Sequence, residues 1–169
     1  MRILAKTKSN DKQLSVKKID NGIVIDHIVT GGAFYVLQAL NIDVHFPHSV
    51  FIAMNVPSKK LGRKDVLKIR NIGKEDLNLD LLGLLISGSN FICIENYHIV
   101  HKEKIQTPEK AYGVIKCPGI SCITNLREDV ETEFTVIGSN EVGNRENLSL
   151  RCVYCDKIFK ILENISLIQ

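Results

Sequence analysis

Two close pairs of cysteines constrain the fold of this chain more than any other feature. Four residues separate Cys117 from Cys122, and two residues separate Cys152 from Cys155. Two tight loops of this kind bring four thiolates into a tetrahedron, the geometry that zinc prefers. Four sulfur ligands close the coordination sphere, so no position is left for an activated water. We therefore predict one structural Zn²⁺ per chain, bound by these four cysteines.

Two alternatives to zinc stay open at this point. Sulfur-only ligation also suits iron, which would make the site a redox centre. Two disulfides would require an oxidising compartment, which clustered pairs in a chain without a secretory signal do not favour. The fifth cysteine, Cys93, lies inside the apolar run Phe91–Ile94 and is expected to be a small buried hydrophobic residue.

The segment before the cysteines contains a regular alternation of predicted strands and helices. After a short apolar stretch at 14–16, which either forms a hairpin with the next strand or continues it, the order is strand, helix, strand, strand, helix, strand. The predicted strands are Ile23–Ile25, Val50–Val56, Val66–Ile69 and Phe91–Ile94, and Tyr97–Val100 either continues the last of them or pairs with it. The first helix follows Ile23–Ile25, has Thr30 as its N-cap and carries Phe34, Leu37 and Leu40. The second helix precedes Phe91–Ile94 and carries Leu77, Leu81, Leu84 and Leu85.

This order predicts an α+β protein whose first domain has the ferredoxin-like βαββαβ arrangement. The pattern stops near Thr107 and Pro108, so we expect a domain boundary there, with domains at 1–107 and 108–169. The second segment has few apolar positions, and domains of this small size usually need a metal or a disulfide to be stable. We expect it to be a small all-β, zinc-ribbon-like domain.

Composition narrows the function classes. The net charge is only +3, and the segment from Cys117 onward has more acidic than basic residues, which argues against a zinc-ribbon module that binds nucleic acid. Met1–Lys18 lacks the apolar core of a secretory signal, and no apolar run approaches the ~20 residues that span a bilayer. We expect a cytoplasmic protein without membrane contact. Because nucleophile-elbow and glycine-rich phosphate-loop motifs are missing, we also expect no enzymatic activity.

Polar and basic residues on the predicted strands of the first domain form a candidate anion site. His27, Lys68 and Lys102 supply charges and donors for a polyphosphate. Asp26 would repel phosphate and is expected to accept hydrogen bonds from ribose hydroxyls instead.

Other residues of the same segments suit a nucleobase. Backbone groups near Ile19 and Tyr97 are placed to bind a base edge, and Val16, Val24 and Ile99 are placed to pack on the ring. The alternative is a solvated strand face with surface lysines and a structural histidine, and the residues alone do not decide between the two.

The same segments, in the same order, resemble the regulatory chain of aspartate carbamoyltransferase. The resemblance covers about Leu14 to Phe159. The matching segments are Gly22–Ile28, Asn55–Ser58, Gly62–Lys68, Ile94–Tyr97, Cys117–Cys122 and Cys152–Cys155.

This resemblance implies a non-catalytic subunit that binds CTP and ATP in its first domain. It implies that Asp26 and Lys102 hold the ribose, that Lys102 and His27 face the phosphates, and that Lys68 meets the base and ribose. The carbonyls of Ile19 and Tyr97 would accept from the cytosine amino group. It further implies that the zinc domain contacts the catalytic chain, that regulatory chains pair through their first domains, and that the assembly serves pyrimidine biosynthesis. The alternative is that the zinc-bound chain mainly holds the assembly together and has a structural role.

Overall fold

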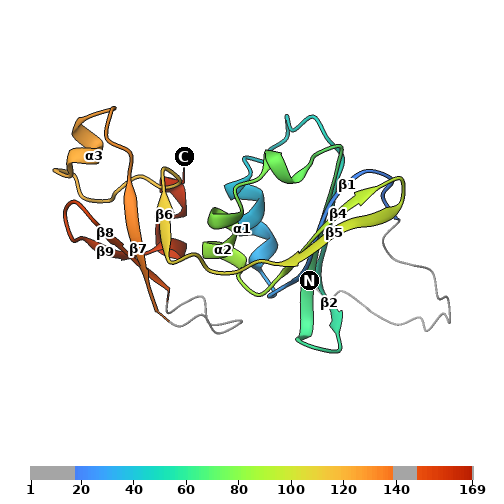
Figure 1. The fold of residues 1–169 in the computed structure, drawn as a ribbon. Helices are drawn as coiled ribbons and strands as arrows, with labels where there is room; N and C mark the ends of the chain where they lie inside the picture. Colours follow the sequence, from blue (N-terminus) through green and yellow to red (C-terminus); the bar gives the residue numbers. More distant parts are fainter. Residues whose placement is uncertain (1–17, 139–147, 169) are drawn as a thin grey trace, which may run out of the picture.

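A computed structural model of the chain describes residues 18–138 and 148–168 (Figure 1). The first sheet is built from β1 (Gly22–Ile28), β2 (Val50–Ser58), β3 (Gly62–Arg70), β4 (Asn90–Glu95) and β5 (His98–Lys104). Helices α1 (Gly32–Ala39) and α2 (Leu79–Ile86), with the 3₁₀ turn η1 (Lys74–Asp76), connect these strands. The second part contains β6 (Lys110–Tyr112), α3 (Ile123–Leu126), β7 (Glu133–Ile137), β8 (Ser149–Cys152), β9 (Ile158–Lys160), η3 (Ile161–Glu163) and η4 (Ile165–Leu167).

The first sheet has the predicted ferredoxin-like topology. Its strand order is β2-β3-β1-β4-β5, and every neighbouring pair is antiparallel. The first four strands with α1 and α2 reproduce the βαββαβ order. Strand β5 is an addition at the edge beside β4, so the segment after Tyr97 pairs with β4 instead of continuing it. The expected α+β class is confirmed.

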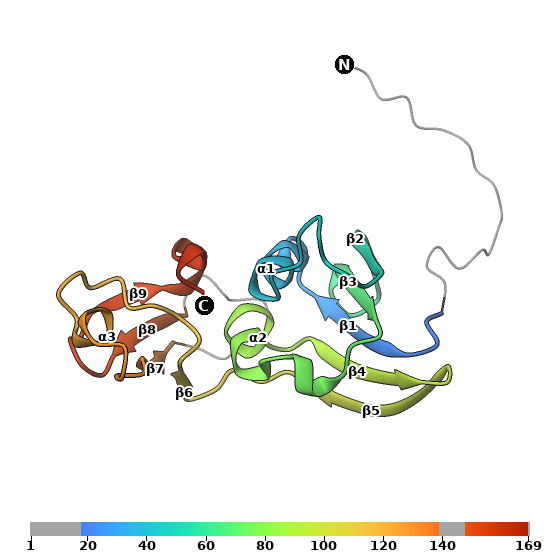
Figure 2. The ribbon, with the colours of Figure 1, turned by 90° about the horizontal axis from the view of Figure 1, so that it is seen from above.

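Both helices cover one face of this sheet and lie side by side (Figure 1, Figure 2). Successive side chains of a strand point to opposite faces. On β1, Ile23 and Ile25 point to the helices and are fully buried. Val24 and Asp26 therefore point to the opposite face, which the helices leave uncovered.

Helix α1 differs from its prediction in both its start and its buried face. Gly31, not Thr30, is the N-cap, and no side chain caps the helix locally. The buried residues of α1 include Ala33, Val36 and Ala39, whereas Phe34 is 60% exposed. The prediction was wrong for Phe34, whereas Leu37 and Leu40 are partly buried and pack against the core. The small residues are buried more deeply because they allow the closer approach of the helix to the sheet.

The second part of the chain forms the expected small β domain. Its sheet has the order β6-β7-β8-β9, and all its pairs are antiparallel. Phe134 of β7 and Phe159 of β9 pack edge to face with ring centroids 5.4 Å apart, and they form the small core of this sheet. The short helix α3 follows directly on Cys122.

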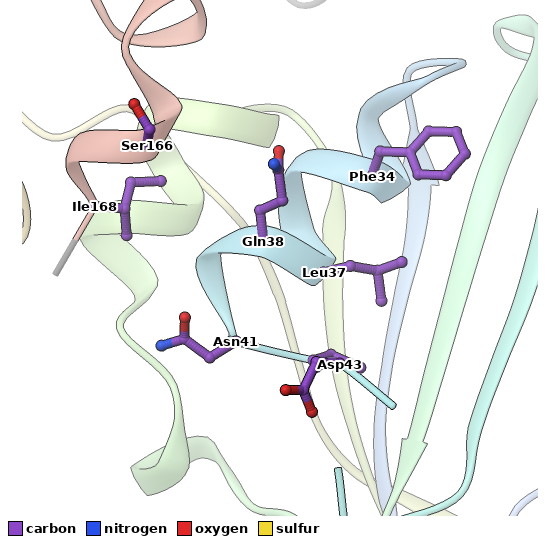
Figure 3. A pocket seen from close by; sticks show the side chains of 8 residues that line it. Phe34, Leu37, Gln38, Asn41, Asp43, Ser166 and Ile168 are labelled. Carbon is purple, nitrogen blue, oxygen red and sulfur yellow. The ribbon is translucent and has the colours of Figure 1, made fainter. Parts of the chain in front are cut away.

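Helices α1 and α2 also separate the two sheets, and the buried residues on both sides form one continuous apolar cluster. The C-terminal turn η4 belongs to the second part and contacts α1 of the first. Ile168 forms a β-bridge with Ile115, and the Lys116 amide donates to the Leu167 carbonyl at 2.8 Å. Figure 3 shows Ser166 and Ile168 of this segment facing Gln38 of α1 and Asn41, just after the helix, across a hollow of about 590 Å³.

Within the described residues, no helix is long and apolar enough to cross a membrane. The cytoplasmic location stays a prediction.

Candidate functional site

The four paired cysteines converge on one point at the end of the second sheet. Their sulfur atoms all lie within 4.8 Å of one another. The Sγ atoms of Cys117 and Cys155 are 3.5 Å apart, and those of Cys122 and Cys152 are 3.7 Å apart. Zinc with Zn–S bonds of about 2.3 Å in a tetrahedron requires sulfur atoms about 3.8 Å apart. All four cysteines are free thiols, so the geometry fits a metal site and not two disulfides.

The loop after Cys117 is shaped around these sulfurs. The Gly119 amide donates to Cys117 Sγ at 3.4 Å. A Cβ at Gly119 would lie 3.2 Å from the Cys155 sulfur and 3.4 Å from the Cys117 sulfur, so a side chain there would press on two of the ligands. Asn125 of α3 donates its side-chain amide to the carbonyl oxygens of Cys117 and Gly119 at 2.8 and 2.9 Å, which holds the loop against the helix.

The thiols differ in how easily they ionise. Burial raises the pKa of the Cys117 thiol well above its usual range. Burial also acts to raise the pKa of Cys122, but hydrogen bonds outweigh it and lower that pKa to about 7; among them is the Thr124 hydroxyl, which donates to the sulfur at 3.2 Å. Metals bind the thiolate form, so the Thr124 contact favours the ligand state of Cys122.

The candidate nucleotide residues lie on the face of the first sheet that the helices leave uncovered. Directly paired residues of neighbouring strands share a face. The pairing aligns Phe51, Lys68, Val24, Ile92 and Lys102 in one row across β2, β3, β1, β4 and β5. Lys68 and Lys102 therefore stand on the same face, on either side of Val24 and Ile92.

A second row lies toward the end of β1 and contains the polar cluster. Asp26 pairs with Asn90, which pairs with Lys104. Lys64 of β3 reaches across with its Nζ 2.6 Å from Asp26 Oδ1. His27 has a positive φ of 60°, and the β1–β3 register shifts between Ile25 and Ile28, which marks a bulge. Bulges of this kind redirect side chains next to functional sites.

The bulge brings the His27 ring back onto Asp26. Its Nδ1 lies 2.9 Å from Asp26 Oδ2 and 3.2 Å from the side-chain nitrogen of Asn90. Burial acts to raise the pKa of Asp26, but the hydrogen bonds from Lys64 and the His27 amide, with the nearby positive charge, lower it overall. Burial lowers the pKa of Lys68, and the charge of Asp26 partly opposes this shift. Asp26 is thus a carboxylate surrounded by cationic groups.

A third row lies at the other end of β1 and is mainly apolar. Gly22 pairs with Arg70 on one side and with Ile94 on the other, and Ile94 pairs with Ile99. Ile19 is buried just before β1, and the Tyr97 amide donates to the Asp20 carbonyl at 2.9 Å. The backbone near Ile19 therefore lies beside the β4–β5 turn. Val16, the remaining predicted residue, lies outside the described residues.

The structure brings eight of the nine predicted nucleotide-binding residues onto or beside one face, and it adds residues that sequence reasoning missed. The added residues are Lys64, Arg70, Asn90, Ile92, Ile94 and Lys104. Alternation along β3 and β5 offered a signal for these cations, because Lys64 and Arg70 lie an even number of residues from Lys68, and Lys104 an even number from Lys102. Nothing in the sequence indicated the register that places Asn90 beside Asp26.

We predict that Asp26→Asn destabilises the first domain in a pH-dependent way. The pKa of Asp26 in the folded chain lies below its ordinary value of 3.8, so its stabilising contribution is present above that value and is lost as the pH falls through the folded pKa. We expect a difference of about 1–2 kcal/mol from wild type near pH 6, typical of hydrogen bonds to a charged group. Urea unfolding of both chains from pH 6 to pH 2.5 measures it. If the difference in free energy of unfolding between the two chains persists at pH 2.5, Asp26 does not have the lowered pKa assigned to it. Acid also removes metal, but it does so from both chains alike.

Comparison with known proteins gives one consistent family. Residues 14–106 match the family model described as aspartate carbamoyltransferase regulatory chain, allosteric domain. Residues 109–165 match the model described as aspartate carbamoyltransferase regulatory chain, metal binding domain. The second match agrees with the four-cysteine cluster, which fits a structural zinc ion.

Individual relatives carry the same description. The chain is 42% identical to the aspartate carbamoyltransferase regulatory chain of Thermoplasma volcanium over 147 residues, covering 87% of this chain and 93% of the relative. It is 40% identical to that of Haloarcula marismortui over 151 residues, covering 89% and 92%. It is 41% identical to that of Methanocaldococcus jannaschii over 146 residues, covering 86% and 92%.

Proposed function

This chain belongs to the family of aspartate carbamoyltransferase regulatory chains, and we propose that it binds CTP and ATP on the uncovered face of its first sheet and passes the effect of binding to catalytic chains. As a member of this family it is a regulatory and not a catalytic subunit. The observation that carries the proposal is the convergence of cations on that face around a single carboxylate. The cations are Lys64, Lys68, Lys102 and Lys104.

The two ends of this face differ in the way that a nucleoside triphosphate requires. Near His27, cationic side chains surround Asp26, and this end suits the phosphates. Near Gly22, the apolar residues Ile94 and Ile99 pair across β4 and β5, and this end suits the base. Val24, Lys68 and Lys102 lie in the row between, where the ribose would lie. We therefore assign the triphosphate to the His27 end and the base to the Gly22 end.

Residue roles follow from this orientation. Lys102 reaches the ribose and phosphates, Lys68 the base and ribose, and His27 the phosphates. Asp26 is already engaged by Lys64 at Oδ1 and by His27 at both oxygens, so in accepting ribose hydroxyls it shares its oxygens with these two residues. The carbonyls of Ile19 and Tyr97 accept from the cytosine amino group, and Val24 and Ile99 pack on the ring.

The second domain carries the surface that we assign to the catalytic chain. Large apolar side chains gather on the loops and strands around the metal cluster. They are Ile120, Ile123, Leu126, Val153, Tyr154 and Ile158, with exposed fractions from 42% to 93%. An apolar surface of this kind on a small domain is typical of a protein interface.

The outer edge of the first sheet supports the pairing of regulatory chains. Strand β2 is the end strand of the sheet, and its residues Phe51 and Ile52 are 40% and 44% exposed. An apolar, unpaired strand edge is a template for a second copy of the same strand. We propose that two chains associate there through their first domains.

Regulation requires that a nucleotide bind differently to two states of the assembly, because equal affinity shifts no equilibrium. Typical coupling free energies are about 1–3 kcal/mol, equivalent to roughly 5- to 150-fold in affinity. The continuous apolar cluster that joins the two sheets through α1 and α2 supports such a coupling. A chain that binds no nucleotide would instead be mainly a structural tie of the assembly.

The test is calorimetric titration of the zinc-loaded chain with CTP, followed by ATP in competition. We expect saturable, mutually exclusive binding. Lys102→Ala should weaken it by roughly 10- to 100-fold, the loss expected for one charge-assisted contact. The control is Lys157→Ala, which removes the same charge from an exposed position in the second domain and should leave affinity unchanged. Absent binding, or equal losses in the two variants, would refute the nucleotide site.

A further inference from the structure

We infer that the ion pair between Asp20 and Arg70 positions the backbone that distinguishes cytosine from uracil. The two bases differ at one ring position, where cytosine has an amino group and uracil a keto oxygen, and the ion pair sets the preference of the site for the amino group. This inference rests on the proposed function, since it concerns the carbonyls of Ile19 and Tyr97 that would face the base. Asp20 and Arg70 themselves are assigned no contact with the nucleotide.

The segment from Lys18 to Asn21 needs such a device because it belongs to no helix or strand. Its position depends on a few tethers to neighbouring strand ends. The Asn71 amide, just after β3, donates to the Asn21 carbonyl at 3.2 Å. The Asn96 amide, in the β4–β5 turn, donates to the Asn21 side-chain oxygen at 3.1 Å. The Tyr97 amide donates to the Asp20 carbonyl at 2.9 Å.

The turn that faces this segment is itself constrained. Asn96 and Tyr97 both have positive φ, 48° and 66°, as the central residues of a type I′ hairpin turn do. This conformation is costly for a tyrosine, so contacts around it must maintain it. The bonds from Asn96 and Tyr97 to Asn21 and Asp20 are such contacts. The Ile19 and Tyr97 carbonyls are therefore held relative to each other by one shared network.

Arg70 anchors this network to the sheet. It is the last residue of β3, and its backbone amide donates to the Ser49 carbonyl at 3.0 Å. Its Nη2 lies 2.7 Å from both carboxylate oxygens of Asp20. The Asn21 amide and Arg70 together hold the pKa of Asp20 below its usual range. The ion pair thus fixes the residue directly after Ile19 to the rigid end of β3.

The consequence concerns discrimination more than overall affinity. A carbonyl accepts a hydrogen bond from the amino group of cytosine but opposes the keto oxygen of uracil, so its position determines the difference between the two bases. Loosening the segment weakens that difference. The phosphate end, near His27, lies at the far end of β1 and contributes equally to both nucleotides.

The experiment measures CTP and UTP affinities of the full zinc-loaded chain by calorimetry. The variants are Asp20→Arg, Arg70→Asp, and the double exchange Asp20→Arg/Arg70→Asp, which keeps the total charge of wild type. Each single change should lower the CTP-over-UTP affinity ratio by about tenfold, the value of one neutral hydrogen bond. The double exchange should restore most of it. Arg70→Gln, which keeps a polar side chain of similar length, supplies the same test where a charge reversal prevents folding.

The possible results separate the inference from the proposed function. A wild-type chain that binds neither nucleotide refutes both. The wild-type chain could prefer CTP while the variants lose CTP and UTP affinity equally. That result refutes the inference and leaves the nucleotide site intact, because a change in net charge alone produces an equal loss. Failure of the double exchange to recover the ratio also overturns the inference.

Discussion

Removing the metal is expected to unfold residues 109–168 while the β1–β5 sheet stays folded. Structural zinc contributes apparent free energies of about 10–16 kcal/mol in small domains, more than the core of this domain supplies alone. The second sheet has a small core of its own around Phe134 and Phe159, and its loops end on the cysteine ligands. The first sheet has its own buried residues on β1, β3, β4 and both helices. Amide hydrogen exchange before and after treatment with a strong chelator measures the effect, strand by strand.

The matched variants are Cys155→Ala, which removes one ligand, and Cys93→Ala, which removes a cysteine from β4 outside the cluster. Cys155→Ala should reproduce the exchange pattern of the chelated chain and abolish binding to catalytic chains. Cys93→Ala should keep the metal and the binding. Elemental analysis distinguishes zinc from iron in the same samples. A chelated chain with unchanged protection in β7, β8 and β9, or a Cys155→Ala chain that still assembles, would show that the metal does not hold this domain together.

The second large effect is expected at Asp65, the fully buried carboxylate of β3. Its Oδ2 accepts from the Gly31 and Ala33 amides at 2.8 and 3.3 Å, at the start of α1. Its Oδ1 accepts from the Asn55 amide at 2.8 Å, within the irregular part of β2. The helix has no local side-chain cap, so Asp65 satisfies its first amides from a distance and also complements the helix dipole.

Asp65→Ala leaves three amides without this acceptor, two of them at or next to the buried start of α1. Each unsatisfied buried donor costs about 1–3 kcal/mol, so the total loss should be about 3–5 kcal/mol, a large part of the stability of a typical domain. Asp65→Asn keeps one oxygen and should lose less. The measurement is the free energy of unfolding of the first domain in urea, followed by circular dichroism.

The control for Asp65 is Asp43→Ala. Asp43 also accepts from a backbone amide, that of His45 at 2.8 Å, but it lies at the surface in the loop after α1. Exposed groups can bond to water instead, so this change should cost less than about 0.5 kcal/mol. Similar losses for the two variants would mean that the buried cap does not hold α1 on the sheet.

The metal site could be predicted almost completely from the sequence. Cysteine spacing in two local pairs is a property of short segments, and the sulfur ligands of each pair are near each other whatever the rest of the chain does. The strand and helix order of the first domain was equally accessible, because hydrophobic periodicity is local. From the order β1, α1, β2, β3, α2, β4 the ferredoxin-like topology follows by general rules of chain connection.

The uncovered face that we propose as the nucleotide site could be predicted only in part, because it depends on register between strands far apart in the sequence. Lys68 and Lys102 were chosen by residue type, but the pairing of Val24 with Lys68 and Ile92 is what brings them to one row. Asn90 was missed for the same reason, since it is not near Asp26 in the chain, and only the structure shows that Lys64 reaches Asp26. The start of α1 was misplaced at Thr30 because its true cap is the carboxylate of Asp65, 34 residues from Gly31.

The sequence by itself therefore determined the metal ligands, the element order and the family, all of which are encoded in local spacing and periodicity. The tertiary structure alone decided which side chains share the uncovered face, which carboxylate caps α1, and how Asp20 and Arg70 hold the segment before β1. The physical reason is that hydrogen bonds and charges act over a few ångströms of space. A one-residue change in the register of β3 would turn Lys68 to the opposite face from Val24 while leaving every local pattern in the sequence unchanged.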